Sequence, residues 1–483
     1  MRRELIIALS IAWCLVIARC LVYVLYEQSF FDSDQAIVGL MAKHLAEGRA
    51  FPLFFYGQDF MLAVEAWLAA PLFWIAGSSV ATLHASLLLT NLAIVTLLVV
   101  GLWRWGGLRP FHALAAAAFF AFAPPLTTAF LVQANGGNIE PFLFLLLLWI
   151  VRERPLWFGL LLGIGFLNRE FTIYAVPVIL AGQAVEGRLF NSKAVRDWLI
   201  VAVAFSAVLA GVEGLKPLAD LRGPGTRGQL APGVSLSEID NLSERSNLVI
   251  SELPARIRAM ALDRLPLLVG AKEIDDVVAR QGRDWMAWPL AGGLVLALLR
   301  ALTLNWRPGA RPVLSFGWYV LGIGIMAAAG YVVTRSAAQN IYRYYLIALL
   351  IPVGITAVFL AAEPRPWLRR AMIALVAIWT VFSGVDHVRL FARYHRGGEP
   401  DEARTLADAL MARQVRIAEA GYWRAYKLTF LTGERVIVAS SDVARIDEYQ
   451  SKADAAGDQL RTIQERPCVG GEPIAGWFLC RGT

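Results

Sequence analysis

The chain is poor in charged residues, histidine and cysteine. Of its 483 residues only 17% are charged, against about a quarter in a typical soluble domain, and 57% are hydrophobic. Its five histidines show no metal-ligand spacing, and nothing else in the sequence supports a divalent metal or another cofactor. Neither a Walker A motif nor a G-x-S-x-G elbow is present. These absences speak against a soluble domain, ATP-driven transport and hydrolase chemistry.

Long apolar runs dominate the remaining sequence, and many approach the length that crosses about 30 Å of hydrocarbon. The first run exceeds the apolar region of a signal peptide and no small-x-small cleavage site follows it, so we expect it to be a retained helix. Segment 59–77 carries Asp59 and Glu65 and is predicted to be an interfacial or re-entrant helix. We predict eleven spans, at 5–26, 80–103, 111–131, 139–151, 155–167, 171–186, 198–215, 286–304, 312–333, 344–361 and 371–387.

The net charge of +7 has a membrane explanation and gives no support for nucleic-acid binding. Basic residues recur in alternate short loops, whereas the loop at 133–138 contains no Lys or Arg. The positive-inside rule therefore places the N-terminus in the cytoplasm. With an odd number of spans, the C-terminus is expected on the outer face of a bacterial inner membrane, in the periplasm. The larger outer segments are then 27–79, 216–285 and the tail from 388.

The C-terminal tail differs in composition from the membrane part. Residues 400–415 have the pattern of an amphipathic helix, and residues 434–440 that of a buried strand. We therefore predict an all-α multi-pass membrane protein, residues 1–387, followed by a small α/β domain, residues 388–483. A disulfide between Cys468 and Cys480 would fit an oxidising outer face, and two free thiols are the alternative.

The segment FFDSDQAIVGLMAKHL, residues 30–45, places two carboxylates where the chain leaves the membrane. Helical spacing predicts a short amphipathic helix on the outer surface, with Asp32 as its N-cap and Gln35 completing a capping box. Asp34 lies on the same side as Ile37, where an acid is costly and points to a function. Its alternative role is as a partner of the helix dipole.

Three stretches resemble bacterial membrane glycosyltransferases of the GT-C fold, whose relatives in kind are protein O-mannosyltransferases and the aminoarabinose transferase of lipid A. The first is the acidic pair followed by GLMAKHLAEGRAFPLFFYGQDFMLAVEAWLAAPLF. The second is NIYRYYLIALLIP, residues 340–352. The third is GYWRAYKLTFLTGERVIVAS, residues 421–440. The resemblance implies about eleven transmembrane helices and an inverting transfer of sugar from a polyprenyl-phosphate carrier to an acceptor hydroxyl on a lipid, glycan or protein.

The resemblance also implies roles for the two acids. The outer-loop aspartate of such enzymes acts as the general base, and their usual Asp-Glu signature corresponds to Asp34 and Gln35 here. Since the glutamate is lost, Asp32 is a candidate substitute for the second carboxylate.

The leaving phosphate needs a positive partner. Relatives often carry a lysine where this chain has Gln58, so Arg343 is the best candidate, because a guanidinium pairs bidentately with phosphate. Its alternative role is an interface anchor. Arg335 and Lys43 are weaker candidates for the same role.

Five further side chains are candidates for lining the substrate cavity. For Arg169 an ion pair with its neighbour Glu170 is the structural alternative. For His44 and Glu65, an ordinary polar position on a helix surface is the alternative. The five are His44, Gln58, Glu65, Arg169 and Tyr345.

Two other functions are compatible with a membrane protein of this kind. A transporter or flippase of lipid-linked sugars would be expected to show related halves, and no internal repeat is visible. A membrane scaffold without catalysis would have no need for the outer-loop acids. The sequence therefore favours an enzyme, without naming its sugar or its acceptor.

Overall fold

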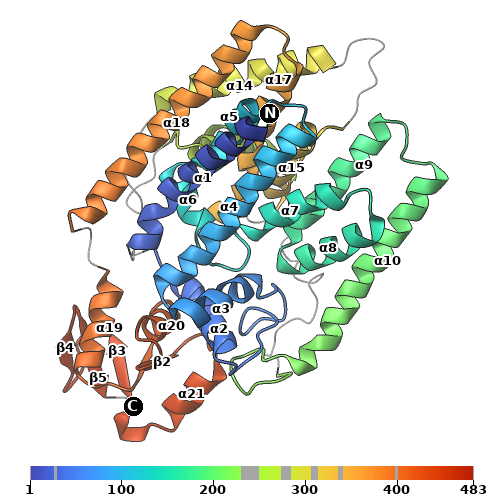
Figure 1. Ribbon diagram of the computed structural model, residues 1–483. Helices are drawn as coiled ribbons and strands as arrows, with labels where there is room; N and C mark the ends of the chain where they lie inside the picture. Colours follow the sequence, from blue (N-terminus) through green and yellow to red (C-terminus); the bar gives the residue numbers. More distant parts are fainter. Residues whose placement is uncertain are drawn as a thin grey trace.

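The computed structural model describes residues 2–26, 30–229, 250–272, 284–305, 314–334, 341–397 and 401–481. Most of them form helices, which fill the body of the molecule (Figure 1). The α-helices of the first 250 residues are α1 (Arg2–Leu25), α2 (Ser33–Ala46), α3 (Val64–Ala76), α4 (Val80–Arg104), α5 (Pro110–Ala121), α6 (Pro125–Leu131), α7 (Glu140–Val151), α8 (Pro155–Asn168), α9 (Ala175–Val185) and α10 (Ser192–Leu215). Those that follow are α12 (Leu253–Ala259), α13 (Leu265–Leu268), α14 (Asp284–Asn305), α15 (Phe316–Val333), α17 (Leu350–Ala362), α18 (Pro366–His395), α19 (Glu402–Ala412), α20 (Tyr422–Leu431) and α21 (Asp447–Asp454).

By the criterion of length and apolarity, fewer helices qualify as membrane spans than the eleven predicted from the sequence. Among the described residues seven helices meet it, and the pair α5 and α6, bent by 84°, makes up to eight. All eleven predicted spans fall on helices, but those at 139–151, 155–167 and 171–186 are short apolar helices that do not meet it. The count of eleven crossings is therefore not confirmed. Helix α3 has 13 residues and, at about 1.5 Å per residue, is too short to cross the bilayer upright.

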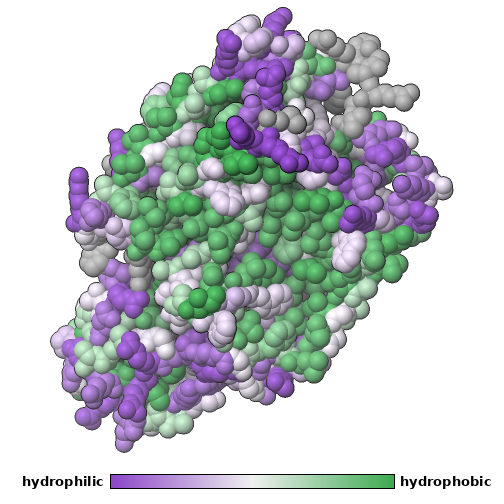
Figure 2. Space-filling model, in the orientation of Figure 1, coloured by the Kyte–Doolittle hydropathy of each residue, from purple (hydrophilic) through white to green (hydrophobic). Residues whose placement is uncertain are grey.

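The surface shows a hydrophobic band between two hydrophilic ends. In Figure 2 the band crosses the middle of the visible face. The N-terminus and the C-terminal tail lie at opposite ends of the molecule (Figure 1). This arrangement suits a protein that crosses a membrane with its termini on opposite sides.

The tail contains the predicted helix and strand. Helix α19 lies within 400–415, and the fully buried strand β2 (Ile437–Ser440) lies within 434–440, so both predictions are confirmed. Helix α18 continues without a break past residue 388, where the composition changes, and ends at His395.

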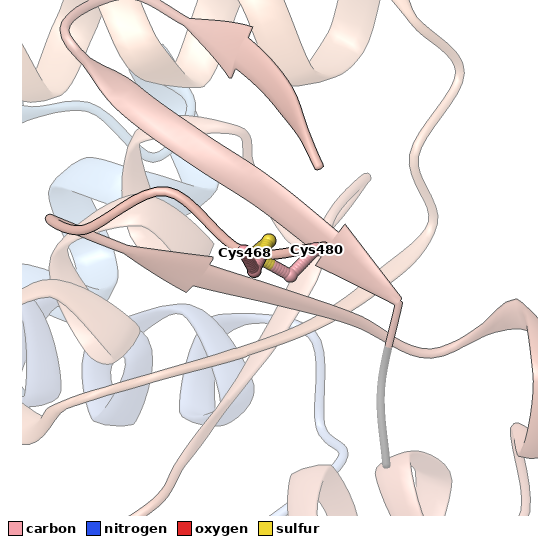
Figure 3. The surroundings of a disulfide bond; sticks show 2 residues. All are labelled: Cys468 and Cys480. Carbon is pink, nitrogen blue, oxygen red and sulfur yellow. A yellow bond between two sulfur atoms is a disulfide. The ribbon is translucent and has the colours of Figure 1, made fainter. Parts of the chain in front are cut away.

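The strands of the tail form a mixed sheet. The other strands are β1 (Ile417–Ala420), β3 (Arg461–Gln464), β4 (Glu472–Ile474) and β5 (Trp477–Arg481). The strand order is β2-β1-β3-β5-β4, with β1 parallel to β2 and β3, and β5 antiparallel to β3 and β4. Cys468 and Cys480 form a disulfide, which ties the segment before β4 to strand β5 (Figure 3).

Helix α2 is buried on nearly all sides, which differs from the predicted amphipathic helix on the membrane surface. It packs against α3 and against α20 of the tail. Gly39 permits the close approach of α20, since a Cβ atom at this position would lie 2.5 Å from the ring of Phe430. The tail therefore covers the helix that carries the two acids.

Candidate active site

Asp32 caps the N-terminus of helix α2. Its Oδ1 accepts a hydrogen bond of 3.0 Å from the backbone N–H of Gln35, and its Oδ2 accepts one of 3.2 Å from the side-chain amide of Gln133. The predicted N-cap is thus confirmed. The second half of the predicted capping box is wrong, because the Gln35 side-chain oxygen lies 3.2 Å from Nε2 of His84 and does not accept from the Asp32 N–H.

Asp34 points toward the C-terminal tail. Its Oδ1 accepts a hydrogen bond of 2.5 Å from the hydroxyl of Tyr422, the first residue of α20. The Tyr422 backbone is fixed at both ends, because its N–H donates to Asp442 at 2.8 Å and its carbonyl accepts from the Ser33 hydroxyl at 2.7 Å. Among the described residues no other donor bonds to the Asp34 carboxylate, so its Oδ2 has no hydrogen-bond partner there.

The groups around Asp32 have opposing effects on its pKa. Burial raises the pKa of Asp32 to about 6, because the ionised form loses contact with water, and the negative charge of Asp34 adds to the increase. The hydrogen bond from Gln35 and the positive charges of Arg343 and Lys427 act in the opposite direction. Asp32 therefore lies within electrostatic range of a second carboxylate, Asp34, and of two cations.

Arg343 is the predicted phosphate partner. It lies in a 3₁₀ helix, η5 (Tyr342–Leu349), with its guanidinium carbon 5.4 Å from the centre of the Tyr344 ring. Its Nε is buried and has no hydrogen-bond partner among the described residues. Tyr345, a predicted cavity residue, is fully buried and packs against Tyr331, with ring centres 4.9 Å apart. Arg343 thus has donor capacity left for an anion near Asp32.

Lys43 and His44 lie elsewhere, in a cluster that joins α2 to the tail. Lys43 forms ion pairs with Glu434 and, at 2.8 Å, with Glu47. His44 is fully buried, with Nε2 3.2 Å from Glu434 and Nδ1 3.2 Å from the Tyr56 hydroxyl. These contacts occupy both side chains, which argues against Lys43 as a phosphate partner and against His44 as a cavity residue.

Glu65 and Arg169 lie near each other in the interior. Glu65 accepts hydrogen bonds from the backbone N–H groups of Gly136, at 2.6 Å, and Gly137, at 2.9 Å. Burial raises the pKa of Glu65, while those bonds and the charge of Arg169 act against the increase. Glu140, which the sequence analysis did not single out, is a second buried carboxyl beside Glu65.

The remaining predicted positions are less informative. The Gln58 backbone closes a turn by donating to Phe55 at 3.0 Å, and its side-chain Oε1 is buried without a partner in the described part of the chain. Arg335 lies outside the described residues. In those residues no three His, Cys, Asp or Glu side chains form a group that could hold a metal ion.

Tyr422 and Lys427 are the site residues that the sequence analysis missed. Both belong to the tail segment 421–440, whose resemblance to transferases was recognised without a role for either side chain. Lys427 is buried and forms an ion pair of 3.3 Å with Asp401. Only the packing of α20 on α2 brings these residues to the acids.

Comparison with solved structures identifies the fold. ArnT from Cupriavidus metallidurans in the apo state matches with a TM-score of 0.61 and 10% identity, over 98% of this chain and 97% of that chain. The same protein bound to undecaprenyl phosphate matches with a TM-score of 0.59 and 12% identity, over the same shares. This chain has the GT-C fold.

A third match is more distant. The Archaeoglobus fulgidus oligosaccharyltransferase in the apo form gives a TM-score of 0.50 at 14% identity, over 91% of this chain and 65% of that chain. No protein-family model and no curated protein matches the sequence. At these identities the GT-C fold is shown, and the activity has to be inferred from the site.

Proposed function

We propose that this GT-C protein is an inverting glycosyltransferase that moves a sugar from a polyprenyl-phosphate carrier to an acceptor hydroxyl. The observation that carries the proposal is the start of α2, where one carboxylate oxygen of Asp34 has no partner among the described residues and the neighbouring Asp32 lies within electrostatic range of the cation Arg343. The same fold occurs in ArnT, which has been crystallised with undecaprenyl phosphate. A base and an anion partner are the two groups that transfer from a phosphate carrier requires.

In the proposed reaction Asp34 is the general base. Its Oδ2 takes the proton of the acceptor hydroxyl while the oxygen forms a bond to the anomeric carbon of the sugar. The bond from that carbon to the phosphate oxygen breaks, and polyprenyl phosphate leaves with the electron pair. Arg343 would stabilise the negative charge on the leaving phosphate. Attack opposite to the leaving group inverts the sugar carbon.

Asp32 and Tyr422 have supporting roles in this reaction. Both oxygens of Asp32 already accept hydrogen bonds, so it holds the start of α2 in place. The Tyr422 hydroxyl occupies Oδ1 of Asp34 and orients the carboxylate. In the proposed division of the chain, residues 1–387 form the transferase domain and residues 388–483 an outer domain that supplies Tyr422.

We further propose that the reaction takes place on the periplasmic face of a bacterial inner membrane, with a lipid, glycan or protein as acceptor. The alternation of basic loops supports a cytoplasmic N-terminus. The disulfide between Cys468 and Cys480 suits an oxidising compartment on the side of the tail.

A release assay tests the proposed activity. Purified protein in detergent micelles is incubated with a panel of polyprenyl-phosphate sugars and with bacterial envelope extract as the acceptor source. Release of free polyprenyl phosphate from at least one donor is expected. Movement of the intact lipid-linked sugar across proteoliposomes, with no release from any donor, would contradict transfer and indicate a flippase.

A further inference from the structure

Loop 133–138, QANGGN, is a polar segment held inside the protein between α6 and α7. All six residues are buried, including Gln133, Asn135 and Asn138. Gly136 and Gly137 have φ of 68° and 98°, a conformation that glycine adopts readily, and both donate their N–H groups to the carboxylate of Glu65. The loop is therefore fixed in shape.

The loop is hydrogen-bonded to Asp32 on one side and, through the Asn138 amide, to the carbonyl of Phe130 at 3.2 Å on the other. The amide of Asn138 donates to Gln133 at 3.4 Å, and the amide of Gln133 donates to Asp32 at 3.2 Å. On the other side, Phe130 stacks on Tyr342 with ring centres 4.5 Å apart, and Tyr342 directly precedes Arg343. The loop therefore connects Asp32 with the segment that carries Arg343.

The loop carries hydrogen-bond acceptors that the protein does not use. The Oδ1 atoms of Asn135 and Asn138 are buried and have no hydrogen-bond partner among the described residues. Asn168 shows the same pattern, since its amide donates to the Leu62 carbonyl at 3.5 Å while its Oδ1 accepts nothing in the described part of the chain. Its neighbour Arg169 contacts Gly137, where an added Cβ would lie 2.3 Å from Arg169 Cγ.

Buried acceptors without partners are costly, because each has lost its hydrogen bonds to water. A ligand that removes this cost must bring hydrogen-bond donors. The hydroxyl groups of a sugar are such donors, whereas a phosphate or a prenyl chain offers none at neutral pH. The unused oxygens therefore match the sugar and neither of the other parts of the donor.

We propose that loop 133–138 is the sugar-recognition element of the protein, with the amide oxygens of Asn135 and Asn138 accepting hydrogen bonds from hydroxyls of the donor sugar. Asn168 adds a third acceptor from the end of α8. This inference rests on the proposed transferase function and names the part of the protein that selects the sugar. It predicts a hydroxyl-rich sugar at the site.

Asn135→Leu gives the sharpest test, because no described residue hydrogen-bonds to the Asn135 side chain. Asn305→Leu is the matched control, since its amide donates to Ala301 within its own helix α14. The substrates are the polyprenyl-phosphate sugar that the wild type turns over and its monodeoxy analogues. Each lacks one hydroxyl, and kcat and KM for release of polyprenyl phosphate are measured for every pair.

One neutral hydrogen bond corresponds to about tenfold in kcat/KM. On the parent donor Asn135→Leu should lose about tenfold, mainly through KM, and Asn305→Leu should match the wild type. On the deoxy donor that lacks the hydroxyl bound by Asn135, kcat/KM of the wild type should fall by the same factor. For Asn135→Leu, kcat/KM should be the same on this donor as on the parent donor. Losses that multiply on every deoxy donor, or an Asn135→Leu variant equal to the wild type, would overturn the inference while leaving the transferase function intact. Absence of release from every donor would overturn both.

Discussion

One buried carboxylate of the tail, Glu434, forms several of the contacts between the tail and the C-terminal end of α2. Its side chain is only 8% exposed. It pairs with Lys43 and, at 2.9 Å, with Arg49, and it accepts a hydrogen bond of 2.9 Å from Tyr449. Burial acts to raise the pKa of Glu434, but the hydrogen bonds and charges of His44 and Lys43 outweigh it and hold this pKa well below its ordinary value.

Glu434→Gln should therefore loosen the tail from α2. The variant keeps the shape of the side chain but removes the charge that accepts hydrogen bonds from Lys43 and Arg49, and a hydrogen bond to a charged group contributes about 1.5–3 kcal/mol. Taking about 3 kcal/mol, the population in which α2 and α20 open should rise roughly 100-fold. Hydrogen–deuterium exchange of their backbone amides in the intact protein measures this change at pH 7.

Glu448→Gln is the control for this experiment. Glu448 also pairs with Arg49, at 3.0 Å, but its side chain is 23% exposed, and such pairs contribute at most about 1 kcal/mol. Exchange in α2 and α20 should rise less than about tenfold in this variant. The excess exchange of Glu434→Gln should also shrink as the pH falls below 4.5, the ordinary pKa of glutamate, because the wild type then begins to lose the same contribution. Equal exchange in both variants would refute the role given to Glu434.

Three further predictions concern the site and the topology. Asp32→Asn should stabilise the protein against heat more at pH 7.5 than at pH 4.5. The pKa of Asp32 is raised in the folded protein to about 6 from 3.8, so its contribution to folding stability is full below pH 3.8 and is lost as the pH rises through 6. A shift in melting temperature that is equal at both pH values would contradict this prediction. Tyr422→Phe should lower kcat for polyprenyl-phosphate release about tenfold while α20 stays packed, because Asp34 loses the hydroxyl that orients it; an unchanged kcat would show that the hydroxyl has no part in catalysis. A reporter fused after Thr483 that is active only in the cytoplasm should stay silent, and a bright signal would reverse the proposed orientation.

Local patterns in the sequence predicted the local structure well. The N-cap at Asp32, helix α19 and strand β2 follow from spacing over a few residues, and each is present. The predicted capping box failed in its second half because the Gln35 oxygen contacts His84, a partner from another helix that local spacing does not reveal. The predicted spans at 139–151, 155–167 and 171–186 coincide with helices, but these helices have only 10–17 residues and therefore do not meet the length criterion.

The composition of the site depended on contacts between distant parts of the chain. Tyr422 reaches Asp34 across 388 residues of sequence. Glu434 contacts Lys43 across 391 residues of sequence. This contact occupies Lys43, which had been a candidate phosphate partner only because of its positive charge. Arg343 was selected for its chemistry, and the structure brings it within electrostatic range of Asp32. Residue chemistry therefore identified the candidate side chains. Only the packing of the tail on α2 distinguished the candidates that are already engaged by other side chains from those that are not.

The most direct test of the proposed mechanism compares Asp34→Asn with the wild type in the release of polyprenyl phosphate. Asn is nearly isosteric with Asp and can still accept the hydrogen bond from Tyr422, but it cannot take a proton from the acceptor hydroxyl. The rate should fall by about 10²–10⁴-fold, the usual contribution of a positioned acid–base group. Asp32→Asn should cost much less, since Asn caps a helix about as well as Asp. A folded Asp34→Asn variant that releases polyprenyl phosphate at the wild-type rate would show that Asp34 is not the base.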